Sequence, residues 1–398
     1  MFIALVGKPS SGKSTVFSAM TLVNVAIANY PFTTIEPNKG VSFVRVECVD
    51  KEFGVQCNPR TGYCKNGIRF VPVELIDVAG LVPEAHEGKG RGNQFLSDLS
   101  RADVLIHVVD AAGATNEKGE PVPPGSHDPC NDILFLEEEI DYWFLGILEK
   151  NWGKIAKWPT MGRKQLLEKL AQALSGVGAT ESTIEKTLHQ TDLLEKKLEQ
   201  WSEEDKKAFS VKLREITKPI VIAANKMDMP TAEKNFQRLK EKFPEKTIIP
   251  CSGFAELALK KAAKEGFVEY HPGSADFKEL KTLNEKQKQV LDAIQKMVLE
   301  KYESTGIQAC LDKTVFESLG YIAIFPAGVH KLADANGNIL TDCILMPPHS
   351  TTLDFAFKLH TDMGKGFIKA IDVKTKQMVG KEHALKNRDA IEIVFKAP

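Results

Sequence analysis

The chain lacks the features that mark secreted and membrane proteins. No apolar run approaches the roughly 20 residues needed to span a bilayer. The first predicted strand begins at residue 2, so we expect no leader peptide. Its seven cysteines are odd in number and irregularly spaced, at Cys48, Cys57, Cys64, Cys130, Cys251, Cys310 and Cys343. This pattern favours reduced thiols in a cytoplasmic protein without a membrane segment.

A charge of one sign is also missing. The 52 Lys and Arg residues nearly cancel the 53 Asp and Glu residues. No global field therefore indicates binding to nucleic acid or to anionic lipid, although a local patch is compatible with this balance. The 398 residues are enough for two or three domains.

Cys57 and Cys64 form the only close cysteine pair, and Pro59 and Gly62 between them suggest the tip of a β-hairpin. A zinc site would need two further ligands, and none stands at finger-like spacing. Free thiols are therefore the simpler interpretation of this pair, with a metal site as the alternative.

A phosphate-binding loop is the strongest motif in the sequence. Gly7–Ser14 has the pattern G-x-x-x-x-G-K-[ST], preceded by the apolar run Phe2–Val6 and followed by the helix-compatible stretch Lys13–Met20. Strand, loop and helix together predict a cradle whose N–H groups meet phosphate oxygens. Lys13 would reach the β- and γ-phosphates, and Ser14 would ligate Mg²⁺. The candidate nucleotide-binding residues here are Gly7, Lys8, Pro9, Ser10, Ser11, Gly12, Lys13, Ser14 and Thr15.

Short apolar runs predict an α/β fold with a buried sheet. The expected strands are Phe2–Val6, Val41–Val46, Phe70–Ile76, Val104–Val109, Ile220–Ala224 and Thr247–Pro250. Two of them, Val104–Val109 and Ile220–Ala224, are almost continuously apolar, which is typical of parallel strands covered on both faces. His107 lies inside one of these strands, and we expect it to be a core residue.

The long stretch between these two strands exceeds what a single crossover needs. Its charged, helix-compatible sequence, with leucines at roughly helical spacing, predicts an inserted antiparallel helical pair, or alternatively an arm that docks a partner. Asn284 is expected to cap a later amphipathic helix. The predicted domains are residues 1–130 and 217–320 for the nucleotide-binding domain, 131–216 for the insertion and 321–398 for a small α+β module.

Two further segments predict a switch that responds to the γ-phosphate. Thr33 and Thr34 stand in a loop between the first helix and the second strand, where a threonine can ligate Mg²⁺ and touch the γ-phosphate. Asp77 ends a strand and would hold Mg²⁺, while the Gly80 N–H would sense the γ-phosphate. The candidate catalytic residues are Lys13, Thr34 and Gly80, and the candidate metal ligands are Ser14, Thr34 and Asp77.

The sequence Asn225-Lys226-Met227-Asp228 favours guanine as the base. The Asp228 carboxylate can accept hydrogen bonds from guanine N1–H and the 2-amino group, and adenine offers neither donor. Asn225 would hold the site together and the Lys226 stem would lie along the base. Ser252 and Gly253 follow the last strand, where a backbone N–H can meet guanine O6.

These segments, in this order, resemble the translation-factor-like GTPases. Tyr30–Thr34 and the run from Asp77 to Phe95 are similar to the Obg family, near its YchF branch. Pro347–Phe355 and His360–Phe367 resemble a TGS domain, a β-grasp module. The resemblance implies a Ras-like P-loop G domain with a helical insertion, a C-terminal β-grasp domain, and association with ribosomes or RNA. YchF itself departs from N-K-x-D and tolerates ATP, whereas this chain keeps the motif.

Two departures from related GTPases predict slow hydrolysis. Leu81 stands where a water-orienting glutamine is found in Ras-like proteins. Ser10 stands where potassium-activated relatives carry asparagine, so K⁺ is only a possible cofactor beside Mg²⁺. We therefore expect a GTP/GDP switch with slow turnover that acts on ribosomes or RNA, with a possible activating protein. The alternatives are a nucleotide-dependent binding module with negligible turnover and an ATPase that accepts both nucleotides.

Overall fold

The chain forms two compact units in the computed structural model, which describes residues 1–22, 38–78, 92–156, 162–334 and 336–396. Of these, the first unit holds residues 1–22, 38–40 and 74–310, and the second holds 41–73 and 311–396. Two strands, β2 (Lys39–Glu47) and β4 (Ile68–Asp77), have residues in both units. The two units divide the chain differently from the domain boundaries predicted from the sequence. Those boundaries stay predictions.

A parallel sheet is the centre of the first unit. Its strand order is β4-β1-β5-β6-β7, with every pair parallel, and it comprises the end of β4, β1 (Phe2–Val6), β5 (Val104–Asp110), β6 (Ile220–Asn225) and β7 (Ile248–Pro250). Every residue of β5 is buried, and so are all but the first of β6. The parallel arrangement predicted from the apolar runs is thus confirmed, and His107 lies in this core.

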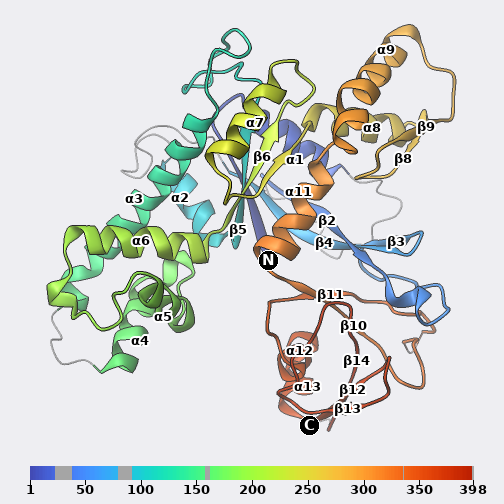
Figure 1. Ribbon diagram of the computed structural model, residues 1–398. Coiled ribbons are helices and arrows are strands. Elements are labelled where there is room, and N and C mark those ends of the chain that lie inside the picture. The colour runs from blue at the N-terminus through green and yellow to red at the C-terminus, as the bar shows by residue number, and fades with distance from the viewer. Residues whose placement is uncertain (23–37, 79–91, 157–161, 335, 397–398) are drawn as a thin grey trace. The chain divides into compact units, whose positions relative to one another are not determined.

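Helices flank the sheet of the first unit (Figure 1). They are α1 (Lys13–Thr21), α2 (Gly92–Arg101), α7 (Ala232–Lys242) and α8 (Gly253–Lys264), and α1 packs on α8. The chain then forms the hairpin β8 (Val268–Tyr270) and β9 (Phe277–Glu279), and the helices α9 (Glu285–Ile294), α10 (Glu300–Tyr302) and α11 (Ile307–Lys313). Asn284 caps α9 as predicted, since its side chain accepts a hydrogen bond from the Gln287 N–H.

In its described residues, the insertion between β5 and β6 contains four α-helices rather than the predicted pair. These are α3 (Cys130–Ile155), α4 (Arg163–Ala173), α5 (Glu181–Gln190) and α6 (Glu203–Thr217). The leucine pattern marks burial correctly, but α5 ends at Gln190 and Asp192 has a φ of 57°. Ser202 then starts α6 with a capping box, so the spacing of apolar residues runs across a turn.

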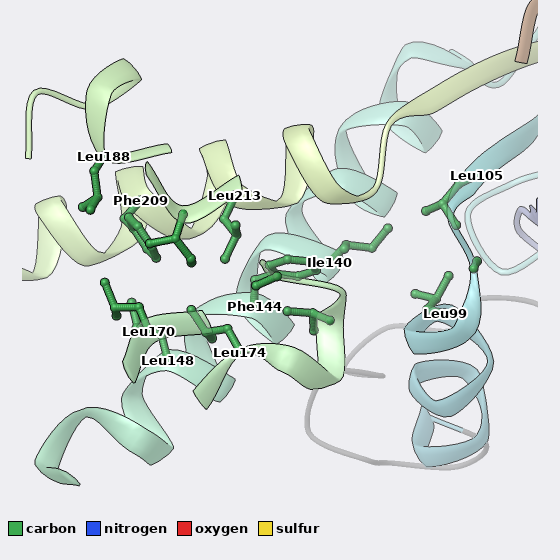
Figure 2. Packing of buried hydrophobic residues seen from close by; sticks show 14 of the residues in the cluster. Leu99, Leu105, Ile140, Phe144, Leu148, Leu170, Leu174, Leu188, Phe209 and Leu213 are labelled. Atoms are coloured by element: carbon green, nitrogen blue, oxygen red, sulfur yellow. The ribbon is translucent and has the colours of Figure 1, made fainter. Parts of the chain in front are cut away.

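The inserted helices share one hydrophobic core with the sheet (Figure 2). Leu99 of α2 and Leu105 of β5 belong to the same buried cluster as Ile140 and Phe144 of α3 and Leu213 of α6. Because this cluster is continuous, the insertion is part of the first unit and not a separately folded arm.

The second unit contains a mixed five-stranded sheet with the order β11-β10-β14-β12-β13. Its elements are β10 (Ile322–Pro326), β11 (Ile344–Met346), α12 (Thr352–Leu359), α13 (Thr361–Lys365), β12 (Phe367–Asp372), β13 (Met378–Val379) and β14 (Ala390–Phe395). The same unit includes most of β2 (Lys39–Glu47), β3 (Tyr63–Lys65) and the first part of β4. None of the helices in the described ranges is long and apolar enough to cross a bilayer.

Candidate functional site

The loop between β1 and α1 lies at the carboxyl end of the parallel sheet. Gly12 has a φ of 91°, a left-handed conformation that glycine adopts without strain. A Cβ atom at Gly12 would lie 2.3 Å from Nδ2 of Asn225. Glycine at this position therefore lets the loop run directly against the end of β6.

The N-terminus of α1 has no side-chain cap and no acidic residue in its first turn, two features that it shares with α4. By contrast, α6 is capped by Ser202 and carries Glu203, Glu204 and Asp205 in its first turn. Free N–H groups and the positive end of the helix dipole make the start of α1 a good place for an anion such as phosphate.

Lys13 and Asp77 come together beside this helix terminus. Asp77 ends β4 opposite Leu5 of β1, and its carboxylate accepts a hydrogen bond from the Lys13 ammonium group. Both side chains are mostly buried, while Ser14 in the first turn of α1 is exposed. The arrangement places an ammonium group, a carboxylate and a hydroxyl close to the free N–H groups of α1.

Asn225 joins the phosphate-binding loop to α8. Its Nδ2 donates to the carbonyl oxygen of Ser11 at 3.0 Å, and its Oδ1 accepts from the Gly253 N–H at 2.9 Å. The side chain is only 3% exposed, so neither bond competes much with water. Three segments far apart in sequence thereby meet at one amide group.

Asp228 lies at the rim of a cavity of about 250 Å³ whose other lining residues are largely apolar and include Phe254 and Val290. Its Oδ1 accepts a hydrogen bond from Ser252 Oγ at 2.7 Å. The Ser252 hydroxyl in turn accepts from the Ala255 N–H at 3.1 Å and so caps α8. Phe254 is 53% exposed here, and no motif in the sequence indicated it.

Asp110 is a candidate site residue that motif analysis missed. It is fully buried at the end of β5, and its Oδ2 accepts a hydrogen bond from Lys226 Nζ at 2.9 Å. Thr115 Oγ1 and the N–H groups of Ala112 and Ala114 also donate to its carboxylate. The sequence does carry a signal for Asp110, because it ends an apolar strand just as Asp77 does.

Lys8 is a predicted site residue whose side chain turns away from the loop. It is buried, donates to the Thr115 carbonyl oxygen at 2.8 Å and pairs with Asp132 of α3 at 2.9 Å. Burial raises the pKa of Asp132, although Lys8 acts in the opposite direction. Lys8 can therefore offer a ligand only its backbone, whereas Pro9 and Ser10 are exposed in the loop.

Several predicted residues lie outside the part of the chain that the structure describes. They are Thr33, Thr34, Gly80, Leu81 and the loop residues up to Arg91. Asn93 and Gln94 fall within the bounds of α2, but nothing is described of their side chains. The switch and hydrolysis predictions that depend on these residues stay predictions.

Comparison with known proteins places the chain in a family. Residues 2–127 match the family described as 50S ribosome-binding GTPase, and residues 223–328 match the Obg-like GTPase YGR210-like, G4 motif-containing domain. A protein of Methanocaldococcus jannaschii named as an uncharacterized GTP-binding protein is 46% identical and is aligned over 99% of each chain. The chain is a member of the Obg-like GTP-binding proteins.

The whole length of this Obg-like protein has counterparts. The crystal structure of a GTP binding protein from Pyrococcus horikoshii OT3 has a TM-score of 0.79 and 38% identity, covering 100% of both chains. The ribosome-binding ATPase YchF of Mycoplasma pneumoniae is 27% identical, covering 94% of this chain and 90% of its own. Residues 333–395 match the TGS domain. The predicted family, its P-loop G domain and the C-terminal TGS domain are thus confirmed, and the Obg-like protein belongs to a family of P-loop nucleotide hydrolases.

Proposed function

We propose that this Obg-like protein is a guanine-nucleotide switch that hydrolyses GTP slowly and associates with ribosomes. The observation that carries the proposal is the bonding of Asn225, which links the loop before α1 to the start of α8. Phosphate-binding and base-binding segments are thereby held in one buried network. A nucleotide that binds both segments would bind more tightly, because little free energy is lost in ordering a site that is already organised.

Selection of guanine rests on Asp228 and its surroundings. The carboxylate borders a largely apolar cavity that can take the flat face of a base, with Phe254 exposed beside it. Its two oxygens can accept from guanine N1–H and the 2-amino group, and adenine would leave them unpaired. Lys226 is fixed by Asp110, so its stem is available to lie along the base.

The residues around the start of α1 fit Mg²⁺. A hydroxyl from Ser14 and a carboxylate from Asp77 are oxygen donors of the kind that this cation prefers, and Thr34 is the further candidate ligand. Bound Mg²⁺ would neutralise phosphate charge during hydrolysis. Lys13 would bind the β- and γ-phosphates, and Gly80 would respond to the γ-phosphate.

Slow hydrolysis is proposed because Leu81 cannot orient water by hydrogen bonding. An activating protein or K⁺ would then raise the rate, and Ser10 makes the K⁺ effect the weaker expectation. Ribosome association is proposed because residues 2–127 match the 50S ribosome-binding GTPase family and because a relative is named as the ribosome-binding ATPase YchF. From Tyr321 onward the chain has ten Lys and Arg against eight Asp and Glu, so charge adds little to this argument.

Titration of the full-length protein with labelled GTP, GDP, ATP and ADP tests the base preference. We expect guanine nucleotides to bind on the order of 10³-fold more tightly, and Asp228→Asn to remove most of that preference. Asp276→Asn, in an exposed loop, is the matched control and should leave it unchanged. Equal affinity for ATP and GTP in the unaltered protein would favour the dual-specificity ATPase instead.

Two further measurements separate a switch from a binding module without turnover. Single-turnover hydrolysis in sodium buffer should be detectable but slow, and faster when ribosomes are added. Cosedimentation with ribosomes should depend on GTP and be lost in Lys13→Ala. Binding that is the same with GTP, with GDP and in Lys13→Ala would contradict the switch, and GTP-dependent binding without any hydrolysis would favour the binding module.

A further inference from the structure

A cluster of three thiols and one carboxylate lies in the second unit, between the candidate site residues Thr34 and Asp77 in the sequence. It consists of Cys48, just after β2, Asp50 in the 3-10 turn Val49–Lys51, Cys57 in the irregular segment that follows, and Cys64 in β3. Their Sγ and carboxylate oxygen atoms all lie within 4.8 Å of one another. Cys48, Asp50 and Cys57 are buried and Cys64 is half-buried.

The distances within this cluster match the edges of a metal tetrahedron. Zinc binds thiolate sulfur at about 2.3 Å, which puts two sulfurs of a tetrahedral site about 3.8 Å apart. Cys48 Sγ lies 3.7 Å from Cys57 Sγ, and Cys64 Sγ lies 3.8 Å from Asp50 Oδ2. A disulfide would need a sulfur separation of about 2.05 Å and would leave the third thiol and the carboxylate without a role.

Arg69 supplies an independent sign that this cluster is anionic. Its side chain is fully buried, and Nη2 lies 3.8 Å from Cys48 Sγ and 2.6 Å from the Leu340 carbonyl oxygen. Within the described ranges, no carboxylate forms an ion pair with it. A buried guanidinium without a counter-charge is costly, so thiolates at the cluster explain why this arginine is tolerated.

The backbone around the cluster holds the four groups in place. The Cys48 N–H donates to the Gly67 carbonyl oxygen at 2.8 Å, which fixes the end of β2 against the β3–β4 turn. Asp50 accepts from the Lys51 N–H through Oδ1, so Oδ2 faces the cysteines. Gly62 has a φ of 70°, and a Cβ there would lie 2.0 Å from the Phe70 carbonyl oxygen.

We propose that Cys48, Asp50, Cys57 and Cys64 bind one Zn²⁺ in a four-coordinate structural site. Three thiolates favour zinc over the hard cations Mg²⁺ and Ca²⁺, and four protein ligands leave no open position for chemistry. The ligand pattern is C-x-D-x6-C-x6-C.

The role of the metal follows from what the site holds together. Between Cys48 and β3 the chain has no regular structure except one 3-10 turn, and such a segment has little apolar material to order it. Arg60 of this segment bonds Asp342, and Arg69 of β4, which contacts Cys48, bonds the Leu340 carbonyl oxygen within the same unit. Zinc would therefore stabilise the segment on which these contacts of the C-terminal part depend.

Metal analysis of the full-length protein tests the site directly. Protein purified without added metal and without chelator should contain about one zinc per chain by mass spectrometry of the elements. Replacement of the zinc by Co²⁺ should give the visible absorption of a tetrahedral thiolate complex. If the reduced protein carries no zinc and takes up neither Zn²⁺ nor Co²⁺, the proposal is overturned, as it is by a Cys48–Cys57 disulfide in the purified protein.

Variants locate the ligands. Cys57→Ser and Cys64→Ser should lose most of the zinc, whereas Cys343→Ser, a buried cysteine of the same unit outside the cluster, should retain it. Cys64→His replaces one zinc ligand with another and should keep the metal, with a shifted Co²⁺ spectrum. This variant remains informative if the serine variants fail to fold, since a folded Cys64→His protein with no metal would contradict the assignment.

Discussion

The nucleotide site and the cysteine cluster differ in how their residues are distributed along the chain. The residues of the proposed nucleotide site stand in two contiguous motifs, Gly7–Ser14 and Asn225–Asp228. Each motif lies at the end of a buried strand. The cysteine cluster takes single residues from a strand end, a turn, an irregular segment and a second strand. Parallel strands bring motifs together at one sheet edge by topology, whereas the cluster depends on how one loop folds back on a hairpin.

The two regions also differ in what orders them. Asn225 and Asp110 organise the proposed nucleotide site through buried hydrogen bonds that exist within the protein itself. At the cluster, the thiols contact mainly each other, Asp50 and Arg69 within the described residues, so its order should depend on a bound cation. Matched substitutions in the two regions should therefore have separable effects.

The largest effect is expected for Gly12→Ala. A methyl group there would overlap Asn225 Nδ2 and force alanine into a left-handed conformation. A cost of roughly 3 kcal/mol would weaken GTP binding about 100-fold. Fluorescence titration with labelled GTP measures the affinity, and zinc content should not change. A variant with unaltered affinity would show that the loop and Asn225 can separate freely.

Gly62→Ala is the matched change in the second unit. Its Cβ would overlap the Phe70 carbonyl oxygen at a φ of 70° and displace the segment between Cys57 and Cys64. We expect a loss of about 2 kcal/mol in the free energy of unfolding and weaker zinc retention against a chelator. Denaturant unfolding and chelator competition measure these two quantities, and GTP affinity should stay within twofold. Weakened GTP binding in this variant would show that the two regions are coupled, contrary to this prediction.

The pH dependence of stability should show a contribution from His107. Burial lowers its pKa to about 3, and the charge of Lys8 acts in the same direction. The unfolded chain then binds the proton more readily, so stability is fully present above pH 6.5 and falls as the pH drops toward 3. At pH 5, His107 should lower the free energy of unfolding by about 2 kcal/mol relative to its value above pH 6.5. In His107→Gln the slope of the unfolding free energy between pH 7 and pH 5 should be shallower; an unchanged slope would place the pH dependence elsewhere.

The smallest effect is expected for Asp110→Asn. The amide keeps the shape but loses the charge that holds Lys226, so the lysine stem becomes less well placed. We expect about tenfold weaker binding of both GTP and GDP, with zinc content unchanged. Isothermal titration calorimetry measures the two affinities. A selective loss for GTP would instead indicate that Asp110 acts on the γ-phosphate.

Sequence reasoning found the parts of the fold that repeat a local rule. The strands Phe2–Val6 and Ile220–Ala224 were predicted because a parallel strand buried on both faces is apolar throughout. It missed two of the four inserted helices, because the buried Leu193, Leu198 and Trp201 keep a helix-like spacing across turns. Asp110, Phe254 and the partners of Cys57 were missed because their roles arise from neighbours distant in sequence.

The amide of Asn225 limits which side chains could replace it. It donates from one end to the Ser11 carbonyl and accepts at the other end from the Gly253 N–H. Aspartate would set an oxygen against an oxygen, leucine would leave both partners unsatisfied, and glutamine would be one methylene too long for the same span. A side chain with a donor at one end and an acceptor at the other therefore acts here as a connector of fixed length. Both ends are needed to keep the spacing between the loop before α1 and the start of α8.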